Sequence, residues 1–91
     1  MIRLSRASIR KIATNDAVYS RGLRYYNNKA IVNVTWSKQN KAYHSIVHGK
    51  ADYDVTIEER KDESFSYHCN CPASIKYNGA CKHVVATLLF I

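Results

Sequence analysis

The stretch "CNCPASIKYNGACKH", residues 69–83, contains all three cysteines of this 91-residue chain and one of its four histidines. Such a crowded set can be a disulfide staple, a reactive thiol centre or the ligand set of a metal ion. The choice decides the fold, because a chain of this length buries too little surface to be more than marginally stable without a cross-link or a metal.

The first two alternatives fit the stretch poorly. A bridge between Cys69 and Cys71 would close a small, strained ring, and pairing either residue with Cys81 would leave one thiol unpaired. A reactive thiol centre usually has a single cysteine with a distant base, or a CxxC at the start of a helix. Here a CxC is followed, after nine residues, by a CxH.

The third alternative fits well, because three thiolates and one imidazole are a complete tetrahedral ligand set for structural zinc. Thiolate-rich sites also prefer zinc to calcium or magnesium. We therefore predict one structural Zn²⁺ held by Cys69, Cys71, Cys81 and His83. Cys69 and Cys71 are two residues apart at the end of an expected strand, so their side chains leave on the same face.

Cys81 and His83 need a different arrangement, since residues two apart in a regular helix point about 200° away from each other. They converge if Cys81 lies just before a helix and His83 lies in its first turn. That position would also place the Cys81 thiolate at the positive end of the helix dipole, which lowers its pKa.

The hydrophobic pattern around this stretch predicts an α+β fold. N-terminal helices should be followed by an antiparallel four-stranded meander with one buried face, then by the zinc-binding loop and a C-terminal helix. The expected helices lie in residues 2–14, 14–28 and 80–91, and the expected strands span residues 30–37, 42–49, 52–59 and 64–69. In the stretch 14–28, Thr14, Asn15 or Asp16 can cap the helix, and the pair Asn27-Asn28 is the expected stop. The last helix is apolar almost all round, so we expect it to be buried by the sheet or by something beyond the chain end.

The second helix carries one stripe of side chains, formed by Val18, Gly22, Tyr25 and Tyr26. A glycine inside a helix costs roughly 1 kcal/mol of helix propensity. We therefore expect another element to approach closely over the missing side chain of Gly22.

The length predicts a single domain over residues 1–91, with residues 1–14 as a helical N-terminal extension and residues 69–91 as the zinc clasp and its helix. The chain stops within an apolar helix, so we expect it to be a fragment of a longer protein. No run of about eighteen apolar residues is present, which argues against a membrane span. An odd number of cysteines favours a reducing cytoplasm over secretion.

The formal net charge is +7, from fourteen Lys and Arg against seven Asp and Glu. Such an excess favours an anionic partner, with nucleic acid first, although solvated side chains are the alternative for each residue. The expected contacts are Arg3, Arg6 and Arg10 on the first helix, Arg21 and Arg24 on the second, and Lys76 and Lys82 in and beside the metal loop. A protein-interaction module is the second hypothesis, because Leu89, Phe90 and Ile91 could need a cover.

The paired motifs Cys69-Asn70-Cys71 and Cys81-Lys82-His83, with Pro72 and Ala86, resemble the SWIM-type zinc finger. The segments "SRGLRYY", "VHGKADYDVTI" and "CKHVVATLL" are similar to the N-terminal module of bacterial SWIM proteins, some of which are Swi/Snf-family helicase-like ATPases. The resemblance implies a non-catalytic zinc module for DNA or protein binding within a larger, cytoplasmic, DNA-associated protein.

The sequence also lacks two motifs that would indicate catalysis. It contains neither a GxxxxGK[ST] phosphate loop nor the HxE…PCxxC pattern of a zinc deaminase. We therefore expect neither an enzyme nor a small-molecule substrate.

Overall fold

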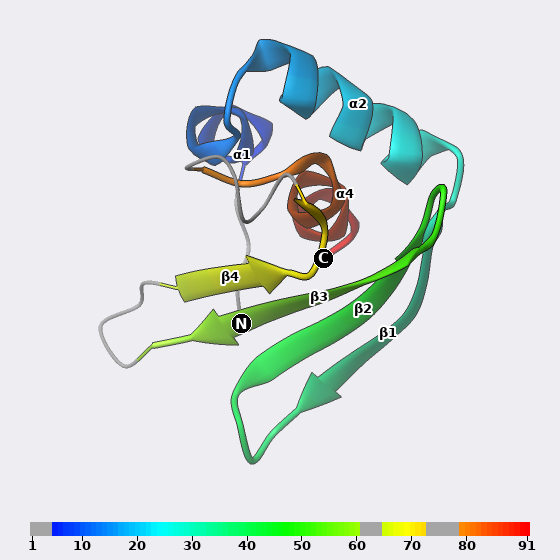
Figure 1. The fold of residues 1–91 in the computed structure, drawn as a ribbon. Coiled ribbons are helices and arrows are strands. Elements are labelled where there is room, and N and C mark those ends of the chain that lie inside the picture. The colour runs from blue at the N-terminus through cyan, green and yellow to red at the C-terminus, as the bar shows by residue number, and fades with distance from the viewer. Residues whose placement is uncertain (1–4, 61–64, 73–78) are drawn as a thin grey trace.

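The computed structural model, which describes residues 5–60, 65–72 and 79–91, has the predicted α+β fold. The elements are α1 (Arg6–Ile12), α2 (Asp16–Asn27), β1 (Ile31–Ser37), β2 (Ala42–His48), β3 (Asp52–Glu59), β4 (Phe65–Cys69) and α4 (Lys82–Phe90). The strands form one antiparallel sheet in the order β1-β2-β3-β4, as the predicted meander requires. Helices α1, α2 and α4 lie on one face of this sheet (Figure 1).

Hydrogen bonds cap helix α2 at both of its ends. The side chain of Asn15 accepts a hydrogen bond from the Val18 backbone N–H at 2.9 Å, which satisfies one free donor of the first turn. At the other end, the left-handed residue is Lys29, with φ 57°, rather than the asparagine that we expected. The Ala30 N–H then bonds back to the Tyr25 carbonyl, which closes the helix.

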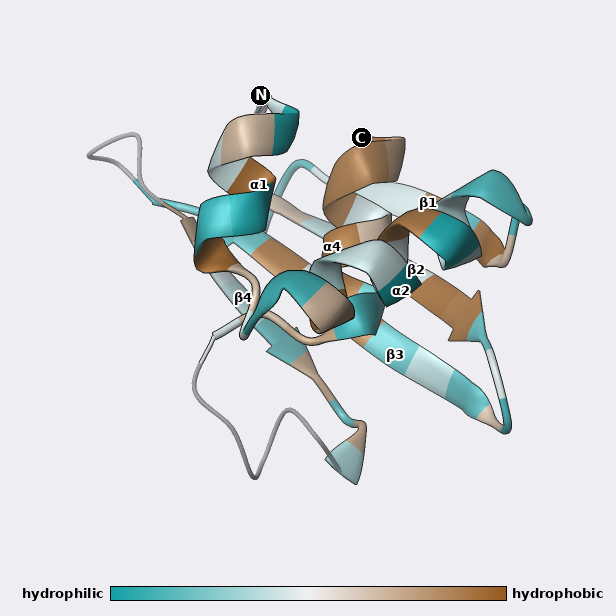
Figure 2. Ribbon diagram, turned by 90° about the horizontal axis from the view of Figure 1, so that it is seen from above, coloured by the Kyte–Doolittle hydropathy of each residue, from teal (hydrophilic) through white to brown (hydrophobic). Residues whose placement is uncertain are grey.

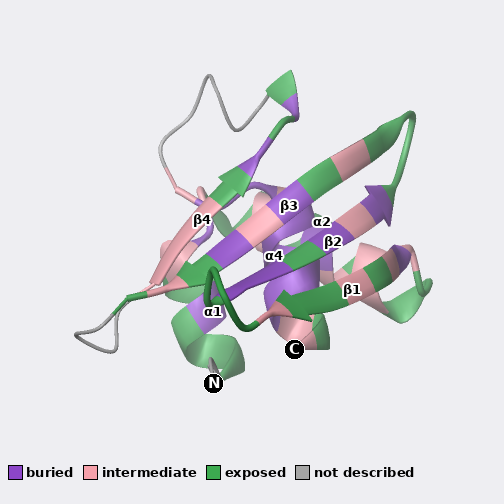
Figure 3. Cartoon of the chain, turned by 90° about the horizontal axis from the view of Figure 1, so that it is seen from below, coloured by how far each residue is buried: buried purple, intermediate pink, exposed green. Residues whose placement is uncertain are grey.

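Strand β3 shows the predicted alternation between a buried and an exposed face. Val55 and Ile57 are fully buried and Tyr53 is half-buried, whereas Asp52 and Asp54 are exposed. Seen from below, the strands lie in front of the helices, and buried and exposed residues follow one another along the strands (Figure 3). The helices therefore cover one face only.

Strand β1 is irregular. In a regular strand Val32, Val34 and Trp36 would share one face of the sheet, but Val32 and Trp36 lie on opposite faces here. A β-bulge lies between Val32 and Thr35, and Asn33 within it has a left-handed φ of 53°. A bulge adds a residue to one strand and so changes which face the following side chains take. As a result Trp36 lies opposite the buried Tyr43 and packs on it, with ring centroids 4.6 Å apart. Trp36 is still 43% exposed, since β1 is an edge strand of the sheet.

Helix α4 is buried on both sides, because it lies between the sheet and α2 (Figure 1). Every residue from His83 to Leu88 is buried. Figure 2 shows hydrophobic residues along α4 and on the strands beneath it. The sheet and α2 thus provide the cover that an all-round apolar helix needs.

The predicted close approach over Gly22 is confirmed. A β-carbon built on Gly22 would lie 2.5 Å from Val85 Cγ1 and 2.9 Å from the Lys82 carbonyl oxygen. On the opposite side of α4, the buried hydroxyl groups of Thr87 and Ser45 of β2 form a hydrogen bond of 2.8 Å. These two contacts fix α4 against α2 and against the sheet.

Among residues 5–60, 65–72 and 79–91, no helix has both the length and the apolar character that a membrane span needs.

Candidate metal centre

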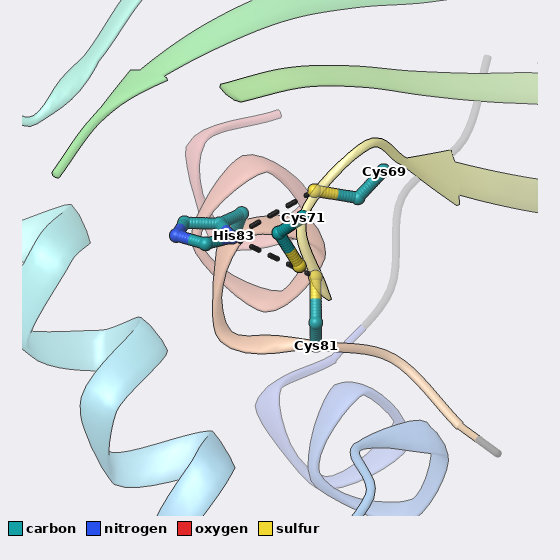
Figure 4. A group of neighbouring side chains, drawn as sticks. All are labelled: Cys69, Cys71, Cys81 and His83. Atoms are coloured by element: carbon teal, nitrogen blue, oxygen red, sulfur yellow. Dashed lines mark hydrogen bonds between the residues drawn. The ribbon is translucent and has the colours of Figure 1, made fainter. Parts of the chain in front are cut away.

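Cys69, Cys71, Cys81 and His83 are all buried, and their ligand atoms lie within 4.8 Å of one another. Cys69 is the last residue of β4, Cys81 directly precedes α4, and His83 lies in the first turn of that helix. Figure 4 shows the four side chains converging from these two segments. The three cysteines are free thiols, so the disulfide alternative is not observed.

The Cys69–Cys71 segment is fixed by strand β3. The residue between the two cysteines, Asn70, donates its backbone N–H to the Asp54 carbonyl at 3.3 Å. Its side-chain oxygen accepts the Asp54 N–H at 3.0 Å. This pair of bonds continues the β3–β4 ladder past its end, so both thiols are held in register with the sheet.

Cys81 is positioned by the link between α1 and α2. Ala80, which precedes it, donates its N–H to the Ile12 carbonyl at 2.8 Å and accepts the Thr14 N–H at 3.1 Å. Gly79 has a positive φ of 93°, and a β-carbon there would lie 3.1 Å from the Ile12 carbonyl oxygen. The segment that contains Ile12 and Thr14 therefore holds Cys81 in place. The spacing of the cysteines did not predict this contact.

The His83 ring is held by two tyrosines. It stacks on Tyr53 of β3 with centroids 4.3 Å apart, and it lies tilted against Tyr25 of α2 at 5.5 Å. This packing points Nδ1 toward the sulfurs, 3.7 Å from Cys69 Sγ and 3.9 Å from Cys81 Sγ. Nε2 is buried and has no hydrogen-bond partner among the described residues.

The donor set and its spacing fit a zinc ion. Bonds of about 2.3 Å to sulfur and 2.0–2.1 Å to nitrogen put the corners of a tetrahedron roughly 3.5–3.8 Å apart. The two measured distances from His83 Nδ1 to sulfur are close to this range. The four residues therefore form a candidate site for a single zinc ion, with Nδ1 as the nitrogen that faces it.

The thiols of Cys69 and Cys81 are coupled electrostatically. A hydrogen bond from Cys69 lowers the pKa of Cys81 to about 4, assisted by His83 and the Val84 N–H at the start of α4. The same hydrogen bond and burial raise the pKa of Cys69. Cys69 therefore keeps its proton more strongly than Cys81 does, and a nearby dication would favour the thiolate form of both.

Three of the seven basic residues predicted to contact nucleic acid meet at one place. Arg21 and Arg24 of α2 and Lys82 of α4 line a pocket of about 240 Å³, together with Tyr25 and Asn28. Lys82 lies between two of the candidate metal ligands, so this pocket adjoins the metal centre.

Of the other four basic residues, the two that the structure describes, Arg6 and Arg10, are not among the residues that line this pocket. Arg6 and Arg10 lie on α1, where Arg10 forms an ion pair of 2.9 Å with Asp16. That contact raises the pKa of Arg10 and lowers the pKa of Asp16 through a hydrogen bond between the two side chains. Arg3 and Lys76 lie outside the described residues.

The remaining histidines lie on the surface. His44 is 3.4 Å from an Asp54 carboxylate oxygen, His48 contacts the Asp52 carboxylate, and His68 is exposed on β4. His68 points away from its neighbour in sequence, because adjacent strand residues face opposite sides of a sheet.

The model of the SWIM zinc finger family matches residues 53–91, the segment that runs from β3 through the metal cluster to the end of α4. This match confirms the SWIM-type zinc finger prediction for that segment, and a SWIM zinc finger is a non-catalytic type of module. Neither the comparison with curated proteins nor the comparison with solved structures found a match.

Proposed function

We propose that residues 1–91 form one zinc-stabilised domain that binds nucleic acid, DNA first, within a larger DNA-transacting protein of the bacterial cytoplasm. The observation that carries this proposal is the convergence of Arg21, Arg24 and Lys82 beside the metal centre. These residues come from helices far apart in the sequence, and one anionic group can contact all three.

The zinc in this proposal is structural. Cys69, Cys71, Cys81 and His83 would fill all four positions of a tetrahedral ion and leave none for water or substrate. The metal would then contribute folding free energy rather than catalysis. The domain is therefore proposed to bind its partner without transforming it.

The distribution of charge indicates which face the nucleic acid would approach. The carboxylates of Asp52 and Asp54 belong to the open face of the sheet, where each lies next to a histidine. Arg21, Arg24 and Lys82 lie on the helical side, and none of them has an ion pair among the described residues. An anionic backbone would be repelled by the first face and attracted by the second.

The test is a titration of the zinc-loaded protein with labelled duplex DNA, single-stranded DNA and single-stranded RNA at several salt concentrations. We expect binding at low salt whose affinity falls linearly on a double-logarithmic plot of affinity against salt. Polyglutamate of similar charge serves as the control polyanion. Absence of binding to all three nucleic acids at low salt, or equal binding to polyglutamate, would count against the proposal.

A second candidate function is protein docking, which one observation favours. Phe90 is 51% exposed at the end of α4 and lines a pocket of about 550 Å³ with Ile31 and Tyr26. If this surface docks on another part of a longer protein, Phe90→Ser should lower the melting temperature of that longer protein and leave that of the isolated domain unchanged. Equal shifts in the two proteins would argue against docking.

A further inference from the structure

We propose that the pocket lined by Arg21, Arg24, Tyr25, Asn28 and Lys82, here called the basic pocket, binds one phosphate group of a nucleic acid and is assembled by the metal clasp. This proposal rests on the proposed nucleic-acid function and assigns it a specific site.

The lining of the basic pocket suits a phosphate group. Two guanidinium groups offer planar forks of N–H donors, which match the geometry of phosphate oxygens. Lys82 adds a third positive charge, and the Asn28 side chain adds an amide that can donate. Among the residues that the structure describes, none that lines the pocket is acidic. A group that carries one or two negative charges and several acceptor oxygens satisfies this set of donors.

The size of the pocket favours a single group rather than a whole ligand. Its volume of about 240 Å³ is below the roughly 300–1,000 Å³ of pockets that enclose small molecules. A phosphate fits inside while its sugar and base remain outside. The contact would therefore position a nucleic acid without reading its sequence.

The three cations are also free to bind an external anion. Within the described residues, no ion pair involves Arg21, Arg24 or Lys82, whereas Arg10 on the neighbouring helix is already paired with Asp16. A phosphate would thus not have to displace an internal carboxylate. It would instead reduce the repulsion among three positive charges held close together.

The position of Lys82 links the pocket to the metal. Lys82 stands between Cys81 and His83, and its ammonium lies 5.5 Å from the centre of the Tyr25 ring. The same ring contacts His83 at 5.5 Å. The Tyr25 ring therefore contacts both His83, a candidate zinc ligand, and Lys82, a cation of the basic pocket. The carbonyl of Lys82 also packs against Gly22, which holds the start of α4 close to Arg21.

The first experiment measures the affinity of the zinc-loaded protein for a labelled oligonucleotide across a salt series. Arg21→Gln, Arg24→Gln and Lys82→Gln should each weaken binding on the order of tenfold, as expected for loss of a charge-assisted hydrogen bond. Each should also lower the salt slope by about one unit. Lys38→Gln is the matched control, because Lys38 lies in the exposed turn after β1 and its loss changes the net charge equally.

The outcomes separate this proposal from the proposed function. If the wild-type protein binds and the three pocket variants behave like Lys38→Gln, the basic pocket is overturned and nucleic-acid binding stands. If the wild-type protein does not bind the oligonucleotide, both the basic pocket and the proposed nucleic-acid function are overturned. Melting curves and zinc content of each variant establish that the fold is intact.

A second pair of oligonucleotides identifies the source of the phosphate. A 5′-phosphorylated strand that binds tighter than its 5′-hydroxyl counterpart, with the preference lost in Arg24→Gln, supports a terminal phosphate. If the two strands bind equally and Arg24→Gln weakens the binding of both, the pocket binds an internal phosphate.

The link to the metal has its own test. Tyr25→Leu should retain zinc, since Tyr25 offers no ligand atom, yet weaken oligonucleotide binding because Lys82 loses its aromatic support. Tyr25→Phe keeps the ring beside Lys82, so it should weaken binding less than Tyr25→Leu does. If Tyr25→Leu retains both zinc and full affinity, Tyr25 does not link the pocket to the clasp.

Discussion

Gly22 of α2 lies so close to Val85 of α4 that a β-carbon at position 22 would be 2.5 Å from Val85 Cγ1. Because His83, a candidate zinc ligand, lies in the first turn of α4, this contact also sets the distance between α2 and the metal centre. The tight spacing lets Tyr25 contact His83 and lets Arg21 and Lys82 line one pocket.

Gly22→Ala should destabilise the fold. The new methyl group would overlap Val85 and the Lys82 carbonyl, and overpacking of this kind costs about 1–3 kcal/mol. The gain in helix propensity, roughly 1 kcal/mol, offsets only part of that. We expect a lower midpoint in urea unfolding of the zinc-loaded protein. Ser20→Ala, an exposed substitution in the same helix, should leave stability unchanged or slightly raised. An alanine at position 22 that matches or exceeds wild-type stability would disprove the steric argument.

Removal of the metal should unfold at least residues 69–91. Structural zinc supplies on the order of 10–16 kcal/mol of binding free energy in small zinc domains, and that energy becomes folding energy. We expect one zinc per chain by elemental analysis, and a loss of helical circular dichroism when a strong chelator is added. Unchanged dichroism and melting after complete removal of zinc would contradict a structural role.

His83→Gln should reproduce the effect of the chelator, because it removes the imidazole of the candidate site. His68→Gln is the matched control, since His68 adjoins Cys69 in sequence but is exposed on the other face of β4. The control should retain one zinc per chain and the wild-type melting temperature. If both variants retain zinc equally, His83 is not a ligand.

Zinc affinity should fall as the pH falls. The pKa of Cys69 is raised above its ordinary value, so its thiol is protonated at neutral pH, and zinc must displace that proton. Cys81, with its pKa lowered to about 4, is already a thiolate and adds no such dependence near neutrality. We therefore expect affinity to rise by at least about tenfold per pH unit between pH 6 and 8. Competition with a chromophoric chelator measures this, and a flat profile would refute the assignment.

The hydrogen bond between Ser45 and Thr87 should show strong coupling between the two positions. Both side chains are fully buried, and Thr87 also donates to the His83 carbonyl. Thr87→Val leaves the Ser45 hydroxyl without its partner, which should cost about 1–3 kcal/mol. The double variant Ser45→Ala/Thr87→Val removes both polar groups and should recover part of the loss. Additive losses in the double-mutant cycle would show that the two hydroxyls act independently.

The secondary structure could be predicted because each element has a clear local signal. Strand β3 alternates apolar and polar residues, and α2 starts at a capping asparagine. The bulge in β1 could not be predicted, since nothing in the residues around Asn33 marks where one extra residue enters the ladder. Trp36, which would share a face with Val32 in a regular strand, consequently lies on the other face, opposite the buried Tyr43.

For the candidate site, the cysteines and the histidine could be predicted from their chemistry and spacing. The backbone hydrogen bonds that hold these side chains in place could not be predicted. Ala80 bonds to Ile12 and Thr14 across more than sixty positions of sequence, and Asn70 bonds to the backbone of Asp54. Backbone hydrogen bonds of this kind leave no mark on residue type, because every residue except proline offers the same N–H and C=O.

The sequence by itself determined the ligand chemistry, because three thiols and an imidazole at the CxC and CxH spacing suit few ions other than zinc. It also determined the α+β order of elements through the periods of its apolar residues. Only the tertiary structure decided which cations act together. Arg21, Arg24 and Lys82 meet because Gly22 lets α4 approach α2, whereas Arg6 and Arg10, equally basic in sequence, lie on α1 outside the pocket. Charge depends on residue type alone, but the electrostatic attraction for one anion depends on distance, and the packing of helices sets that distance.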